Sequence, residues 1–74
     1  YAEVNVSQLN SFVDGTVVDA DLLKASGIIK KIHDGVKILG NGELTSKLTV
    51  KATSFSKSAI EKIEKAGGKT EEVI

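Results

Sequence analysis

Few side chains in this 74-residue chain could do chemistry: one histidine, ten lysines, ten carboxylates and no cysteine. His33 precedes Asp34, which could suggest a general base beside its orienting acid. Adjacent residues rarely point at each other, however, and no Cys nucleophile exists for them to serve. One histidine with scattered carboxylates also lacks the ligand spacing of a metal site. The sequence therefore predicts no enzyme, no metal and no cofactor.

A second chemical pattern is Gly68-Lys69-Thr70, which matches the end of the phosphate-binding loop G-x-x-x-x-G-K-[ST]. The first glycine of that motif would stand at Ile63, which lies in the apolar stripe of an expected helix. The motif should also open a helix, whereas here it follows one. Nucleotide binding is therefore the third hypothesis, and no small-molecule substrate is expected.

The charges are unevenly distributed, although they sum to zero. Residues 1–23 carry only acids, whereas all ten lysines lie between Lys24 and Lys69 against four acids, so that segment is 10 − 4 = +6. The neutral total argues against a strong free-standing nucleic-acid binder, because phosphate neutralisation dominates such affinity. Any single lysine can be explained as part of a solvated protein surface. If the lysines instead share one basic face, they would bind phosphates as point charges without bidentate contacts to base edges.

The length sets the organisation of the chain. We expect one globular domain over residues 1–74, and at this size folding buries only about 60% of the surface that the unfolded chain exposes. No apolar run approaches the roughly 20 residues that cross a bilayer, and no signal peptide is evident, so we expect a cytoplasmic protein without membrane contact. The sequence contains no Met and begins at Tyr1, and we interpret it as a fragment of a longer protein.

A β-like run, a small polar residue, a helix-like run and a glycine recur three times, each with the capping residues of a helix. Such repeats stack because no single unit buries its own apolar face, which predicts a compact coil of strand-and-helix turns. The copies are Val4 to Val6, Ser7, Gln8 to Phe12 and Gly15; Val17-Val18, Asp19, Ala20 to Ser26 and Gly27; and Leu48 to Ala52, Ser56, Lys57 to Ala66 and Gly67.

The expected elements would position the lysines. From Lys47 to Ala52 the sequence alternates strictly, which predicts a half-exposed strand with a lysine side. Val36 to Leu39 predicts another strand, and Gly40-Asn41-Gly42 after it predicts a turn with positive φ angles. In the last helix, Ala59, Ile60, Ile63 and Ala66 share one apolar face.

One stretch also resembles a known signature: Lys37 to Leu44, then Leu48-Thr49-Val50, then Phe55 to Ala59, Ile63 and Gly67. It is similar to the carboxy-terminal globular domain of the ribosomal protein L-fifteen family. Residues Val4 to Leu9 and Ala66 to Lys69 also resemble the bacterial branch of that family. The resemblance implies an α/β fold, an irregular superhelix of β-β-α turns with about three short helices and a short-stranded sheet. In that family a basic Gly-rich arm precedes this domain, and this sequence lacks it.

The leading hypothesis is therefore a structural role in the large ribosomal subunit, with 23S ribosomal RNA and neighbouring ribosomal proteins as partners and no homo-oligomer. The runner-up is a protein-interaction module that uses apolar residues near the acidic amino-terminal third. Charge and exposed-face phase select the candidate phosphate contacts, which are Lys30, Lys31, His33, Lys37, Lys51 and Lys57.

Overall fold

The structure is a computed structural model that describes residues 2–30 and 35–73. Within these residues the chain forms six short strands, two α-helices and one 3₁₀-helix. In chain order the elements are β1 (Ala2–Asn5), η1 (Val6–Ser11), β2 (Val17–Val18), α1 (Ala20–Ala25), β3 (Val36–Leu39), β4 (Thr49–Ala52), β5 (Ser54–Phe55), α2 (Lys57–Lys65) and β6 (Lys69–Glu72).

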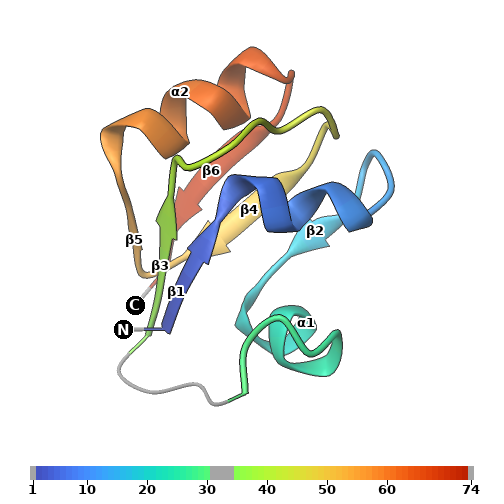
Figure 1. Ribbon diagram of the computed structural model, residues 1–74, viewed down its shortest axis with the longest axis vertical. Coiled ribbons are helices and arrows are strands. Elements are labelled where there is room, and N and C mark those ends of the chain that lie inside the picture. The colour runs from blue at the N-terminus through green and yellow to red at the C-terminus, as the bar shows by residue number, and fades with distance from the viewer. Residues whose placement is uncertain (1, 31–34, 74) are drawn as a thin grey trace.

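The strands divide alternately between two three-stranded sheets (Figure 1). The first sheet has the order β1-β3-β5, the second has the order β2-β4-β6, and every pairing is parallel. The chain is thus a coil of three turns, and each turn adds one strand to each sheet. Successive turns run in the same direction, so their strands pair in parallel. This confirms the expected α/β coil, while the division into two sheets is new.

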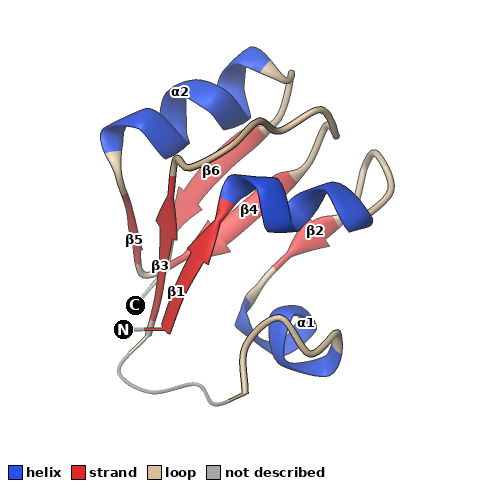
Figure 2. Cartoon of the chain, viewed as in Figure 1, coloured by secondary structure: helices blue, strands red, loops and turns tan. Residues whose placement is uncertain are grey.

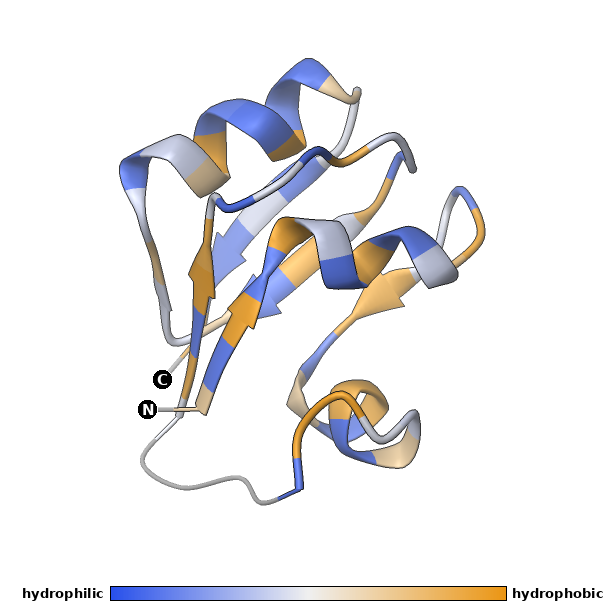
Figure 3. Ribbon diagram, viewed as in Figure 1, coloured by the Kyte–Doolittle hydropathy of each residue, from blue (hydrophilic) through white to orange (hydrophobic). Residues whose placement is uncertain are grey.

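The core lies between the two sheets. Val36 and Ile38 of β3 and Val50 and Ala52 of β4 are buried, while the residues between them are partly exposed, as alternating strands require. Figure 2 shows η1 and α2 together at the end of the molecule where β1 and β3 finish, with α1 at the other end. In Figure 3 the first four strands carry apolar colour, whereas β6 is hydrophilic and forms an edge of the second sheet.

The two α-helices begin at the residues that the sequence predicts. The Asp19 carboxylate accepts the Leu22 N–H (2.8 Å) ahead of α1, and the Ser56 hydroxyl accepts the Ala59 N–H (3.2 Å) ahead of α2. Both predicted caps are therefore confirmed, and the helices end within one residue of their expected limits.

The first repeat was predicted wrongly in detail. Its helix is a 3₁₀-helix that begins at Val6, and its N-cap is Asn5 instead of Ser7. The Gln8 side chain accepts the Asn5 N–H (2.9 Å), so the segment begins two residues earlier than the Ser7 hydroxyl suggested. Val6 is consequently a buried helical residue and not the end of a strand.

The turn after β3 is formed by one glycine with positive φ and one without. Gly42 has φ +80°, as expected, but Gly40 serves a different purpose. A Cβ at Gly40 would lie 2.7 Å from the Ala59 backbone nitrogen, so this glycine lets the loop touch the first turn of α2. The Lys62 ammonium then donates to the carbonyls of Gly40 (2.7 Å) and Gly42, which fixes the loop against the helix.

Candidate nucleic-acid interface

The structure describes four of the six predicted contact residues, and Lys31 and His33 lie outside the described residues. Lys30 is exposed beyond α1, and Lys57 is exposed at the first position of α2. Lys37 lies in β3 and Lys51 in β4, each partly exposed.

The predicted residues Lys37 and Lys51 do not share a face. Lys37 is on the outer side of the first sheet, where its register partner on β1 is Glu3. Lys51 is on the outer side of the second sheet, where its register partner on β6 is Glu71. Because the two sheets enclose one core, their outer sides point in opposite directions, and one RNA strand could not contact both residues over a flat surface.

A different set of lysines does come together, on the outer side of the second sheet. Lys47 and Lys51 flank Thr49 along the chain, and Thr49 is the register partner of Lys69. Lys51 lies two residues along β4 from Thr49, and Lys69 lies opposite Thr49 on the neighbouring strand. The Lys51 and Lys69 Cα atoms are therefore about 8 Å apart. We call Lys47, Lys51 and Lys69 the lysine face.

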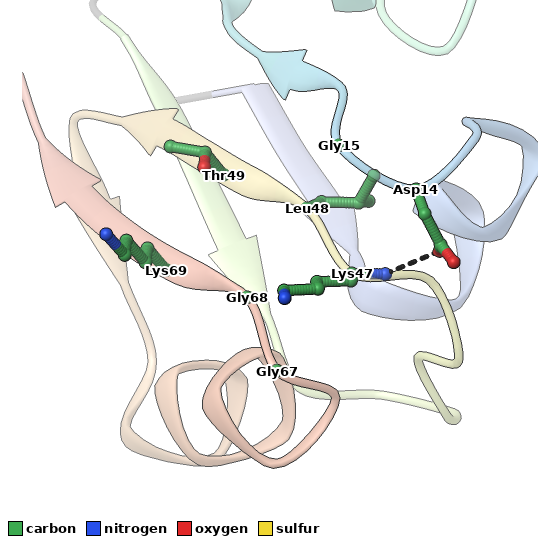
Figure 4. A pocket seen from close by; sticks show the side chains of 8 residues that line it. All are labelled: Asp14, Gly15, Lys47, Leu48, Thr49, Gly67, Gly68 and Lys69. Carbon is green, nitrogen blue, oxygen red and sulfur yellow. Dashed lines mark hydrogen bonds between the residues drawn. The ribbon is translucent and has the colours of Figure 1, made fainter.

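A groove of about 380 Å³ opens at the start of β4 and β6, beside the lysine face. It is lined by residues 14–15, 47–49 and 67–69. Figure 4 shows the Lys47 side chain running toward Gly68, while the Asp14 carboxylate lies at the other end, where it accepts the Lys47 N–H (2.8 Å). We call this cavity the glycine groove.

The Gly68-Lys69-Thr70 segment lies along this groove but is not a phosphate-binding loop. A phosphate loop presents free backbone N–H groups at the start of a helix. Here the Gly68 N–H donates to the Ile63 carbonyl (2.9 Å), the Lys69 N–H donates to the Leu48 carbonyl (2.9 Å), and Lys69 and Thr70 belong to β6. The backbone therefore offers a phosphate neither of these two donors.

Two kinds of feature are absent from the described part of the chain. No helix within residues 2–30 and 35–73 is long and apolar enough to span a membrane. Among the same residues no three His, Cys, Asp or Glu side chains gather into a group that could hold a metal ion.

Lys62 is the lysine whose role the sequence concealed. Helical spacing puts it among the polar residues of α2, yet its side chain is only 30% exposed and binds two loop carbonyls. Its ammonium also lies 3.9 Å from the Glu43 carboxylate. No local pattern could reveal this role, because the Gly40 and Gly42 carbonyls are 22 and 20 residues away along the chain.

Lys47 and Lys69 are the two groove lysines that were not among the predicted contacts. The alternation from Lys47 onward already placed Lys47 on the same side as Lys51, so that signal was present in the sequence. Lys69 reaches the same surface only through the pairing of β6 with β4, which no spacing encodes.

The chain matches a known protein family. The model of a family of 50S and 60S ribosomal proteins, which includes 50S-L15 and 50S-L18e, matches residues 3–71, nearly the whole chain. The matched region includes all six strands to within a residue at either end and both groove lysines. The match confirms the resemblance seen in the sequence and indicates a structural role in the ribosome. The chain belongs to this family of large-subunit ribosomal proteins.

Proposed function

We propose that this domain binds large-subunit (23S) ribosomal RNA in the bacterial cytoplasm and supports assembly of the subunit. The observation that carries the proposal is the separation of charge within a ribosomal family member. Residues 1–23 hold four acids and no lysine, whereas residues 24–69 have a net charge of +6. Clustered cations are what a phosphate backbone attracts, largely independently of its base sequence.

The candidate contacts are lysines, and lysine acts on phosphate as a point charge. Lys30, Lys31, His33, Lys37, Lys51 and Lys57 remain predictions, to which the geometry adds Lys47 and Lys69. Because Lys37 faces away from the lysine face, phosphate contacts on both sides would require RNA to surround the domain. Such a placement suits a structural constituent of a particle.

The test is the salt dependence of binding to 23S ribosomal RNA. If about four phosphates are contacted, the logarithm of affinity should fall against the logarithm of salt concentration with a slope of very roughly −3. A complex whose affinity does not change between about 50 and 200 mM salt would contradict the proposal.

A second function is favoured by one exposed apolar residue. Val13 is 76% exposed and starts a turn in which its carbonyl accepts both the Thr16 N–H (3.2 Å) and the Thr16 hydroxyl (2.7 Å). An exposed apolar turn within the acidic third would pack against a neighbouring protein. Crosslinks from the lysine segment that reach only protein, and never RNA, would favour this function over RNA binding.

A further inference from the structure

The glycine groove has a floor of backbone atoms. A Cβ at Gly68 would overlap the Leu48 carbonyl oxygen, so β6 starts in direct contact with the chain that leads into β4. A Cβ at Gly67 would lie 3.6 Å from Cγ and Cδ of Lys47, so the methylene groups of Lys47 pass over this glycine. The floor is therefore formed by backbone atoms and the Lys47 methylene groups, and it is largely apolar.

The charges of the groove are at its mouth. Lys47 and Lys69 are both exposed, and in Figure 4 their ammonium groups lie on the side away from the Asp14 carboxylate. That carboxylate is the acidic group among the described residues that line the groove, and it is already hydrogen-bonded to the Lys47 N–H. An anion that approaches over Gly68 would meet the two ammonium groups first.

The lining residues limit what the groove could recognise. Those that the structure describes include no aromatic side chain on which a base could stack and no Arg, Asn or Gln that could read a base edge. The Gly68 and Lys69 N–H groups are occupied, so a terminal phosphate has no backbone cradle. Two exposed point charges contribute little to the binding of a small ligand, because water screens them. A polymer that contacts several lysines at once does not depend on either charge alone.

We propose that the glycine groove receives the sugar–phosphate backbone of one ribosomal RNA strand, with Lys47 and Lys69 contacting phosphates and a ribose packing on the glycine floor. This inference rests on the proposed function and assigns it to one surface. Contact is to the backbone only, so the groove fixes the position of the domain on the RNA and does not select a sequence.

The experiment compares two double variants of the 74-residue chain. Lys47→Gln with Lys69→Gln removes two charges from the groove, and Lys24→Gln with Lys65→Gln removes two charges from exposed positions of α1 and α2. Binding to 23S ribosomal RNA is measured over a range of salt concentrations, and circular dichroism checks that both variants fold.

Loss of two phosphate contacts should make the salt slope shallower by about 1.4–1.8 and reduce affinity about 25- to 60-fold at 0.1 M salt. The control variant should keep the slope of the unchanged protein. If the unchanged protein and the control bind with a steep slope and the groove variant matches them, the groove assignment is wrong while RNA binding stands. If the unchanged protein itself binds without salt dependence, the proposed function is wrong and the groove assignment falls with it. Binding of AMP as tight as that of the RNA, lost in the groove variant, would also overturn the assignment to a polymer backbone.

Discussion

Replacing Lys62 by Met tests whether a largely buried cation holds the second and third turns of the coil together. Met keeps most of the apolar stem and removes the ammonium that donates to the Gly40 carbonyl at 2.7 Å and to the Gly42 carbonyl. Hydrogen bonds to a charged group contribute about 1.5–3 kcal/mol each. The hydrogen bond to the Gly42 carbonyl is exposed, and the Glu43 side chain of the ion pair is 85% exposed. Water therefore compensates for most of the loss of these two interactions. We therefore expect the free energy of unfolding to fall by about 2 kcal/mol, which is the contribution of one hydrogen bond to a charged group.

The measurement is the free energy of unfolding in urea, with Lys65→Met as the matched control on the same helix. Lys65 is exposed, so its replacement should change stability by less than about 0.5 kcal/mol. In a domain of this size, about 2 kcal/mol corresponds to a fall in Tm of about 8–16 °C. Amide exchange at Thr45 should also accelerate, because Thr45 follows Gly42 in the loop that Lys62 holds, and loosening that loop would weaken the hydrogen bond from the Thr45 N–H to the Asn10 side chain of η1 (2.8 Å). Equal stability of the two variants would show that the ammonium is not a structural clamp.

Three further substitutions test other parts of the fold by the same urea titration. Ile63→Ala should lower the free energy of unfolding by about 2–5 kcal/mol, because the Ile63 side chain is fully buried in the core. Ile60→Ala, at a partly exposed position of the same helix, should lower it clearly less. Equal losses would contradict the burial of Ile63 in the core. Gly68→Ala should cost about 1–3 kcal/mol, since its Cβ would overlap the Leu48 carbonyl oxygen, and a neutral result would mean that β6 does not approach β4 so closely. Ser56→Ala removes the cap of α2 and should cost about 1 kcal/mol, which Ser56→Asp should largely restore.

Local patterns were sufficient wherever a residue's neighbours along the chain determine its structure. The strand Val36–Leu39 was predicted to the residue, since two buried and two partly exposed positions alternate within it. The caps Asp19 and Ser56 were also predicted correctly, because each bonds an N–H three residues ahead. In the first helix two polar residues competed for the same role, and Gln8 reaching back to Asn5 decided the outcome against Ser7.

The candidate interface was harder to predict because it depends on contacts between turns. Selection by charge and strand phase chose Lys37 and Lys51 together, although the division of the strands into two sheets places them on opposite sides. Lys69 became a neighbour of the same surface through the pairing of residues 49 and 69, a separation for which the sequence offers no periodic signal. Lys62 does not belong to this surface, because its ammonium binds the Gly40 carbonyl, which only the folded loop brings close to it.

Four residues of the signature between Lys37 and Gly67 have a structural role that does not depend on RNA. Gly40 admits α2, Ser56 caps it, Ile63 fills the core beneath it, and Gly67 ends it with φ +90°. Each of these residues supports the formation or packing of α2, whatever the domain binds. The charged groups of the lysine face are not needed for folding in this way, because its side chains are exposed or partly exposed. Substitutions of Lys47, Lys51 and Lys69 should therefore lower RNA affinity without changing the free energy of unfolding, whereas substitutions of the signature's glycines and core residues should lower the free energy of unfolding.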